Sequence, residues 1–317
     1  MTVLITGAGM IGTHVARTLL DQGVGVLLYD PDPPARYIES VVGPDRKLFR
    51  VERGDVRDFP RIMDLMLRLG VTRILHTAGI VGPRVDENPS LAFQTNVEGT
   101  MNVIEAARIR SLARVVVVSS SFVYSNPDVP YGEGPVRESA VYGVPTSFYA
   151  AYKAMAEIMT LAHQRMSSLN AIVVRPGPVY GRGEYAGGAA NGRALNDTLI
   201  RAIDEPPGTE IPVHLPTAER AYVKDVALAI REAIFVEKPS TRIYNIGAGE
   251  LLTTDALASA INQAIPGANV VASPSGPADP TILDSSLARA ELGYTTEWPV
   301  SRAIADYVEE LRAIRAC

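Results

Sequence analysis

The feature that most constrains the fold is a glycine-rich segment near the start of the chain. A short β-branched run at 3–6 leads directly into the spacing G-x-G-x-x-G, which comprises Gly7, Gly9, Met10, Ile11 and Gly12. Apolar residues then recur at helical spacing through 11–19. Glycines at these places permit a tight turn and close packing of helix on strand, and a helix N-terminus favours an anion. The segment therefore predicts the first βα unit of an α/β fold, with an anion site in its loop.

Short apolar runs and helical periods alternate over the first half of the chain. Candidate strands lie at 24–30, 47–52, 73–77, 114–120 and 171–176. Strands that read as continuous apolar runs, separated by helices of about ten or more residues, indicate a parallel sheet that is covered on both faces. The sequence therefore predicts a Rossmann-type, doubly wound parallel sheet.

An acidic residue ends the second predicted strand. Asp30 lies 18 residues after Gly12, where a carboxylate can accept hydrogen bonds from both ribose hydroxyls of a dinucleotide and repels a 2′-phosphate. The alternative is a structural turn followed by a surface aspartate. The complete order of strand, glycine turn, helix, strand and acid favours a site for NAD over one for NADP.

The composition and the pattern of the sequence change after Pro176. Residues 177–193 contain six glycines without a clear period, which is more than a simple connection needs. Further elements are expected at 195–204, 224–237 and 242–246, from 253 or 254, and from about 301. We interpret residues 1–175, together with about 220–246, as an NAD-binding Rossmann domain. The expected substrate-binding cap is smaller, is interleaved with that domain and comprises 176–219 and 247–317.

The charge and cysteine content limit the partners and the compartment. Lys and Arg number 30 against 35 Asp and Glu, and no long like-charged block occurs, which disfavours nucleic acid and anionic membranes as partners. Cys317 is the only cysteine, and the four histidines have no metal-ligand spacing. There is no basic leader and no apolar run near the ~20 residues of a membrane span. We expect a soluble, cytoplasmic protein that binds a small molecule and no metal.

A polar set of residues follows the fifth predicted strand. Ser120 and Ser121 lie at its carboxyl end, and Tyr149 and Lys153 follow at i and i+4 on one face of a predicted helix. A free tyrosine has a pKa of ~10, but an adjacent ammonium and a positive nicotinamide ring favour the phenolate. Tyr149 could then take a proton from a substrate hydroxyl while the carbinol hydride passes to the nicotinamide. A serine hydroxyl would hold the substrate oxygen, and a chance Tyr-Lys pair is the alternative interpretation.

The substrate half of the chain also carries several basic residues, Arg182, Arg193, Arg220 and Lys224. Together they suit a carboxylate-bearing or phosphorylated sugar. Solvated surface charge is the alternative for each of them.

Over essentially its whole length, the chain resembles an extended short-chain dehydrogenase/reductase of the NAD-dependent epimerase/dehydratase family. Besides the motifs above, segments similar to the family's pattern occur in its order at 96–107, 115–124, 175–183, 222–230, 244–250 and 283–294. The resemblance implies that the catalytic hydroxyl residue is the one three places before Val123, which is Ser120. It also implies that Lys153 holds the nicotinamide ribose.

The same resemblance implies further contacts with the dinucleotide. Asp55 and Val56 would contact the adenine, Ala78 and Gly79 would line the cofactor, and the Pro176 region would border the nicotinamide. Asn96 would be a structural or water-organising group near the site. The resemblance further implies a homodimer through a four-helix bundle formed by about 88–110 and 148–168.

The chain departs from the family at three places. Ser121 and Phe122 replace the Asp-Glu pair of the 4,6-dehydratases, so dehydration is not expected. Pro178 replaces an asparagine that helps to hold the diphosphate of a nucleotide sugar, and proline has no N–H to donate. Arg220 precedes Asp225 by five residues, whereas the phosphate-binding arginine of the epimerases precedes it by seven.

Three functions remain open. The first is an NAD-dependent oxidoreductase acting at a secondary alcohol or ketone of a sugar, sugar acid or related polyol, with Ser120, Ser121, Tyr149, Pro178, Arg182 and Arg220 near the substrate. The second is a nucleotide-sugar 4-epimerase, such as one acting on a UDP-hexose, which oxidises its substrate only transiently. The third is a non-catalytic NAD-sensing protein, against which the intact Ser120, Tyr149 and Lys153 argue.

Overall fold

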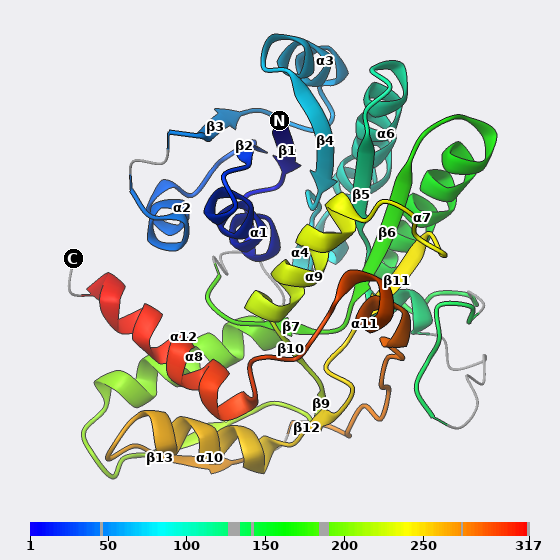
Figure 1. The fold of residues 1–317 in the computed structure, drawn as a ribbon. Coiled ribbons are helices and arrows are strands. Elements are labelled where there is room, and N and C mark those ends of the chain that lie inside the picture. Colours follow the sequence, from blue (N-terminus) through cyan, green and yellow to red (C-terminus); the bar gives the residue numbers. More distant parts are fainter. Residues whose placement is uncertain (45–46, 126–133, 141–142, 184–189, 274, 316–317) are drawn as a thin grey trace.

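The computed structural model describes residues 1–44, 47–125, 134–140, 143–183, 190–273 and 275–315. A seven-stranded sheet in the order β3-β2-β1-β4-β5-β6-β11 forms its centre, and all neighbouring strands are parallel (Figure 1). Its strands are β1 (Thr2–Thr6), β2 (Gly25–Asp30), β3 (Phe49–Arg53), β4 (Val71–His76), β5 (Arg114–Val118), β6 (Ala171–Pro176) and β11 (Ile243–Ile246). This sheet confirms the predicted Rossmann-type α/β fold.

Most strands begin or end one or two residues from the predicted bounds, and two of these differences have a clear structural reason. β5 ends at Val118, two residues early, because the Val118 carbonyl accepts a hydrogen bond from Lys153 Nζ (2.8 Å) and the chain turns into a 3₁₀-helix at Ser121–Tyr124. β4 begins at Val71, two residues early, because Val71 pairs with Thr2 beside an irregularity in register. The serines predicted to end β5 therefore lie in a turn beyond the sheet.

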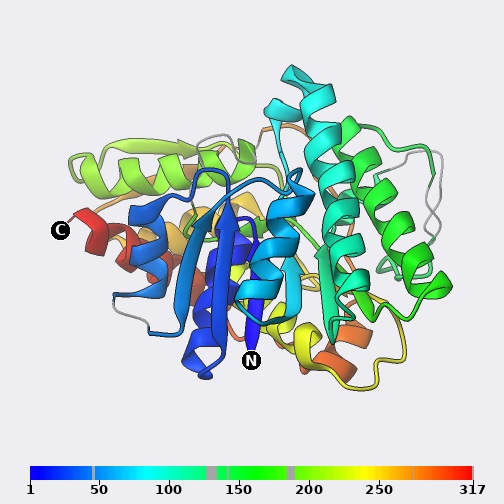
Figure 2. The same ribbon diagram turned by 90° about the horizontal axis from the view of Figure 1, so that it is seen from above.

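Alternate residues of each strand pack on opposite faces of the sheet, as the period of two requires. In β1, Val3 and Ile5 face one hydrophobic cluster and Leu4 faces another. The first cluster includes residues of α1 (Met10–Asp21), α2 (Ala35–Val42), α9 (Val223–Phe235) and α11 (Ser286–Leu292). The second includes residues of α3 (Phe59–Arg68) and α6 (Gly99–Ile109). α7 (Phe148–Met166) lies beside α6 (Figure 2).

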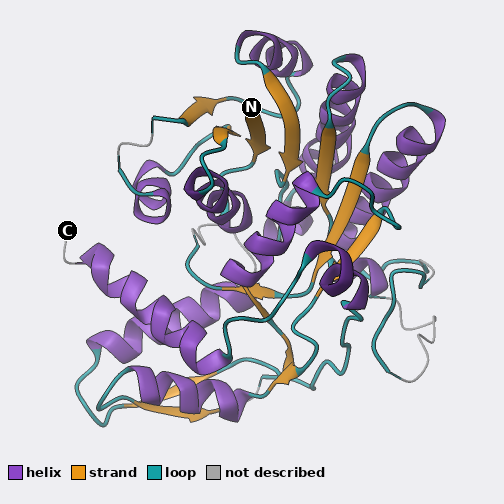
Figure 3. Ribbon diagram, in the orientation of Figure 1, coloured by secondary structure: helices purple, strands orange, loops and turns teal. Residues whose placement is uncertain are grey.

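A further hydrophobic core lies apart from the sheet, among the lower group of helices in Figure 3. It joins α8 (Ala190–Asp204), α10 (Thr254–Ala264) and α12 (Val300–Arg315) to a two-stranded sheet of β8 (Glu210–Val213) and β13 (Asn269–Ala272). Segments that precede and follow α9 in the chain both contribute buried side chains to this core. The helices expected near 195–204, at 253 or 254 and from about 301 are confirmed.

Short elements connect these two regions. β7 (Val179–Tyr180) pairs with β10 (Ala221–Tyr222), and β9 (Ala218–Glu219) pairs with β12 (Leu251–Leu252). After β4 come α4 (Pro83–Glu87), α5 (Pro89–Phe93) and a π-helix at Gln94–Glu98. Within the described ranges, no helix is both long and apolar enough to cross a bilayer. Cys317, and part of the glycine-rich segment 177–193, lie outside those ranges.

Candidate active site

The three glycines of the glycine loop differ in what surrounds them. Gly7 has a φ of +94°, and a Cβ at this residue would lie 2.7 Å from Ala78 N. A Cβ at Gly12 would lie 2.1 Å from the Gly7 carbonyl oxygen, so only glycine allows the helix to pack this closely on the loop. A Cβ at Gly9 would meet nothing within 4 Å. Gly9 therefore borders open space, where a ligand can approach the main chain.

The N-terminus of α1 faces the same loop. Gly9 is the N-cap and, as a glycine, has no side chain to accept a hydrogen bond from the first turn, where Met10 and Ile11 lie. The N–H groups at the positive end of a helix dipole attract an anion. The loop and helix are thus suited to a phosphate group.

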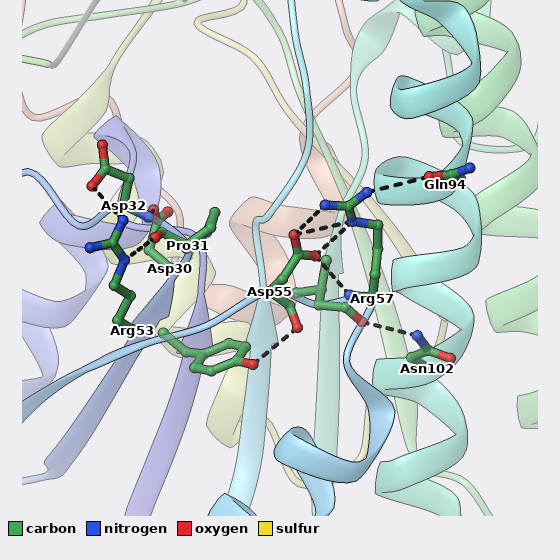
Figure 4. Close-up of polar contacts among 10 residues, drawn as sticks. Asp30, Pro31, Asp32, Arg53, Asp55, Arg57, Gln94 and Asn102 are labelled. Carbon is green, nitrogen blue, oxygen red and sulfur yellow. Dashed lines mark hydrogen bonds and ion pairs between the residues drawn. The ribbon is translucent and has the colours of Figure 1, made fainter.

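Asp30 is held at the end of β2 directly beside this loop. Its Oδ2 accepts a hydrogen bond from Ala8 N (2.8 Å), and its Oδ1 accepts one from Asp32 N (2.9 Å). Arg53, at the end of β3, donates from Nε to the Pro31 carbonyl (2.8 Å) and lies 3.4 Å from Asp32 (Figure 4). No pattern in the sequence points to Arg53. Its guanidinium is a cation close to the place where the 2′-phosphate of NADP would lie.

Asp55 and Val56 occupy the turn after β3. Arg57 forms an ion pair with the Asp55 carboxylate (2.7 Å), and its hydrogen bonds to that group hold the Asp55 pKa below its usual value (Figure 4). Asn102 Nδ2 donates to the Val56 carbonyl (3.0 Å). The Val56 side chain is buried in the core against Gly99. The Val56 side chain therefore serves the core, whereas the Asp55 carboxylate stays partly exposed.

The loop after β4, which contains Ala78 and Gly79, is fixed by Asn96 in the π-helix. Asn96 Oδ1 accepts from Ile80 N (2.7 Å), and its Nδ2 donates to the Ile80 carbonyl (2.9 Å). Ala78 packs on Gly7, and a Cβ at Gly79 would lie 3.1 Å from Asn96 Oδ1. Asn96 therefore sets the position of this loop against the glycine loop.

The predicted catalytic residues come together where β5 ends and α7 begins. Ser120 is the N-cap of the 3₁₀-helix, and its side chain is near enough to the Tyr149 phenol to lower the pKa of that group. Lys153 Nζ lies 5.8 Å from the centre of the Tyr149 ring. Ser147 caps α7 by accepting a hydrogen bond from Ala150 N (3.2 Å), which starts the helix immediately before Tyr149. Ser121 lies beside this group and is partly exposed.

Burial dominates the electrostatics of this group. It lowers the pKa of Lys153 from 10.5 to about 8, although the nearby Glu157 acts in the opposite direction. It raises the pKa of Tyr149, and the Ser120 side chain offsets this only in part. The expected depression of the Tyr149 pKa by Lys153 is therefore absent from the chain alone. A positively charged ligand at the site would favour the phenolate.

A buried ion pair supports the group from behind. Glu157 lies one turn after Lys153 on α7, and Arg175 Nη2 lies 2.7 Å from its carboxylate, with both side chains almost fully buried. Arg175 also donates to Tyr124 Oη in the 3₁₀-helix and to the Glu138 carbonyl. The i, i+4, i+8 spacing of Tyr149, Lys153 and Glu157 could have revealed the glutamate, but nothing local identifies its partner.

The residues expected around the substrate are less closely grouped. Pro176 ends β6 and is buried, and the Pro178 carbonyl accepts a hydrogen bond from Ala221 N (2.9 Å). Arg220 is buried and donates to the Pro216 carbonyl (3.0 Å). Arg182 instead lies over the ring of Tyr37 in α2, 5.1 Å from its centre.

Arg182 and Lys224, two of the basic residues expected near the substrate, make contacts that hold the fold together. The main-chain carbonyl of Arg182 is hydrogen-bonded to His14 Nε2 (2.9 Å) and Tyr37 Oη (3.2 Å), which links the segment after β7 to α1 and α2. Lys224 forms ion pairs with Asp306 (2.6 Å) and Glu310 (2.9 Å) of α12. The Arg182 and Lys224 side chains are therefore engaged by other parts of the fold.

Comparisons with known proteins give this geometry a context. The sequence model of the NAD dependent epimerase/dehydratase family matches residues 3–247. UDP-glucuronate 4-epimerase 4 of Arabidopsis thaliana is 32% identical over 190 residues, which are 57% of this chain and 42% of that protein. The chain is therefore matched to less than half of that relative's length.

Two solved structures are similar over nearly their whole chains. The UDP-glucose 4-epimerase of Thermus thermophilus in complex with NAD is 28% identical, with a TM-score of 0.78 over 98% of this chain and 99% of that one. MoeE5 in complex with UDP-glucuronic acid and NAD is 25% identical, with a TM-score of 0.78 over 100% of both chains. The family match spans the glycine loop, Ser120, Tyr149 and Lys153. The resemblance expected from the sequence is thus confirmed, and the chain belongs to the NAD dependent epimerase/dehydratase family.

Proposed function

We propose that the chain is an NAD-dependent enzyme that transfers a hydride at a secondary alcohol or ketone of a sugar. The grouping of Ser120, Tyr149 and Lys153 at the carboxyl end of β5 carries this proposal. It places a proton acceptor, a hydroxyl and an ammonium together on the side of the sheet where parallel α/β folds bind ligands.

The residues around the glycine loop fit NAD. The open space at Gly9 and the N-terminus of α1 suit the diphosphate, and the Asp30 carboxylate suits the ribose hydroxyls. Asp55, Val56, Ala78, Gly79 and Asn96 surround the next part of the same edge. NAD supplies the hydride acceptor and a positive charge near Tyr149.

The chain's own residues would carry the proton. The Tyr149 phenolate takes the hydroxyl proton as the O–H bond of the substrate breaks. The carbon that bears this hydroxyl gives up its hydride, so that the alcohol becomes a ketone. Ser120 donates a hydrogen bond to the same oxygen, and Lys153 would hold the nicotinamide ribose. Tyr149 returns the proton when the ketone is reduced.

The relatives favour epimerisation of a nucleotide sugar, in which the hydride returns to the opposite face of the ketone. Two of them are named as UDP-sugar 4-epimerases, and MoeE5 is seen with UDP-glucuronic acid. Arg220 is a candidate for the diphosphate or for a sugar carboxylate. Net oxidation of a sugar or sugar acid is the second candidate, because Pro178 offers no donor to a diphosphate.

A panel of substrates distinguishes these two reactions. The protein is incubated with NAD and UDP-glucose, UDP-glucuronate, glucuronate or galactose, and both NADH absorbance and the sugar products are followed. Epimerisation gives a new sugar without net NADH, whereas oxidation gives NADH in proportion to product. The absence of both, in protein that binds NAD, contradicts the proposal and favours a sensing role.

We also propose that two copies associate through α6 and α7. These two helices lie side by side (Figure 2). They expose the apolar side chains of Ile109, Met155, Ile158, Met159 and Met166 to solvent. An exposed apolar stripe on adjacent helices is typical of an interface. We further propose that the protein is cytoplasmic. We also propose that it is divided into a Rossmann domain and an interleaved substrate-binding cap, with the bounds predicted from the sequence.

A further inference from the structure

Phe122 occupies a conspicuous position beside the candidate catalytic residues. Its main-chain N–H donates to Ser120 Oγ (3.2 Å), so its backbone is fixed to one member of the group. Its ring meets the ring of Tyr149 edge to face, with centroids 5.9 Å apart and planes at 76°. Phe122 is thus held against two of the residues that would handle the substrate oxygen.

The exposure of this ring distinguishes it from its neighbours. Val123 and Tyr124, on the same 3₁₀-helix, are 2% and 3% exposed and pack into a small core with Val136, whereas Phe122 is 47% exposed. A phenylalanine gains stability from leaving water, so one that stays half exposed beside polar groups is suited to contact with a ligand. The local fold is therefore served by the two buried residues and leaves the Phe122 ring for another partner.

The geometry also defines which part of a ligand the ring can meet. The reacting hydroxyl must lie at Tyr149 Oη, and the ring next to that phenol can reach the carbons that flank the reacting one. One face of a pyranose ring presents C–H groups, which pack well on an aromatic ring. Neither Phe122 nor Ser121 carries a carboxylate or an amine, so the turn offers apolar contact rather than a second proton acceptor.

We propose that Phe122 is a substrate-positioning residue whose ring packs against the C–H face of the sugar beside the reacting carbon. This inference rests on the proposed function, because it places the sugar hydroxyl at Tyr149. It adds a determinant of specificity: the sugar must present an apolar face to the 3₁₀-helix, and a substrate with a charged group at that face is disfavoured.

Sugar binding tests this inference separately from turnover. Binding of UDP-glucose, UDP-glucuronate, glucuronate and galactose to NAD-loaded protein is measured by calorimetry in a Tyr149→Phe background, so that no reaction occurs. Adding Phe122→Ala should weaken sugar binding about tenfold, and Phe122→Tyr should retain it within about threefold. Phe122→Leu, which keeps the apolar bulk but loses the ring, should resemble the alanine variant. NAD affinity and the melting temperature should not change in any of them.

A matched truncation controls for loss of exposed apolar surface. Leu67→Ala, on α3 and 56% exposed, should leave sugar binding unchanged. Equal sugar binding by the Tyr149→Phe protein with and without Phe122→Ala overturns the inference, even if the wild type turns over normally. Loss of binding in Phe122→Ala, with no turnover in wild type, supports the inference and contradicts the proposed reaction. If no sugar of the panel binds at all, both proposals fail.

Discussion

At the scale of single residues, the environment of Tyr149 decides when it can act as a base. Burial raises its pKa, and within the chain only the Ser120 side chain is identified as lowering it. Burial also lowers the pKa of Lys153, whose Nζ lies 5.8 Å from the centre of the Tyr149 ring. The phenolate should therefore form mainly when the positively charged cofactor is bound, which couples proton transfer to cofactor loading.

Replacing Tyr149 with phenylalanine should abolish turnover by removing the proton acceptor. We expect kcat to fall by a factor of about 10² to 10⁴, with NAD affinity almost unchanged. In the wild type, kcat should rise with pH, because the active form of Tyr149 is deprotonated. Steady-state kinetics over a pH series and calorimetric titration with NAD measure both effects, and full activity in Tyr149→Phe would contradict the mechanism.

Replacing Asp30 with alanine should relax the preference for NAD over NADP. The change removes a negative charge from the ribose site and leaves Arg53 close by to attract a 2′-phosphate. NADP affinity should rise, and the Asp30→Ala/Arg53→Ala double variant should lose that gain. Equal use of both cofactors by the wild type would show that Asp30 does not discriminate between them.

At the scale of elements, Arg175 joins four parts of the fold. It lies at the end of β6, pairs with Glu157 of α7, contacts Tyr124 of the 3₁₀-helix and reaches the Glu138 carbonyl. The carboxyl ends of β5 and β6 and the start of α7 are thereby held in register behind the catalytic group. A buried, multiply bonded arginine is suited to this task, since its guanidinium offers five donors in fixed directions.

Arg175→Met should destabilise the fold by about 3 to 5 kcal/mol, because it leaves the Glu157 carboxylate buried without its partner. The Glu157→Met/Arg175→Met double variant should be less destabilised than this single variant. Arg68→Met breaks a half-exposed pair with Asp64 on α3 and should cost at most about 1 kcal/mol. Urea unfolding of the four proteins tests this, and equal losses for Arg175→Met and Arg68→Met would contradict it.

His76 on β4 joins the sheet to α6 and makes folding stability depend on pH. It is hydrogen-bonded to Thr6 (2.6 Å) and Thr100 (2.9 Å), and burial lowers its pKa from 6.5 to about 3. Below pH 6.5 the unfolded chain gains a proton that the folded chain does not accept, so stability falls as the pH drops toward 3. His76→Gln should reduce the dependence of the unfolding free energy on pH by an amount that corresponds to at most about one bound proton. An unchanged slope in urea unfolding between pH 7 and 4 would show that His76 is not the origin.

At the scale of the whole molecule, local patterns and long-range contacts differ in how well the sequence predicts them. The glycine loop, the sheet and the juxtaposition of Tyr149 with Lys153 depend on nearby residues, and the sequence predicted them. The partner of Glu157 and the orientation of Arg182 toward Tyr37 depend on how distant segments cross in space. Nor could spacing predict that burial would raise the Tyr149 pKa, because it depends on the whole surroundings of the ring.

The association of two copies is the prediction that belongs to this scale. Ile158→Glu places a charge in the exposed apolar stripe of α7 and should convert a dimer into monomers, because a charge cannot be buried there without a partner. Leu67→Glu, on exposed α3, should have no such effect. Sedimentation measures the mass of each protein, and a monomeric wild type would contradict the proposal.

The link between the segment after β7 and α1 has a consequence for how such a protein can change over generations. His14 and Tyr37 are hydrogen-bonded to the main-chain oxygen of Arg182, while the Arg182 side chain lies over the Tyr37 ring. Every amino acid supplies that oxygen, so mutation at 182 can alter the side chain while the anchor persists. The side chain at this position can therefore change its chemistry while the segment keeps its attachment to the helix that follows the glycine loop.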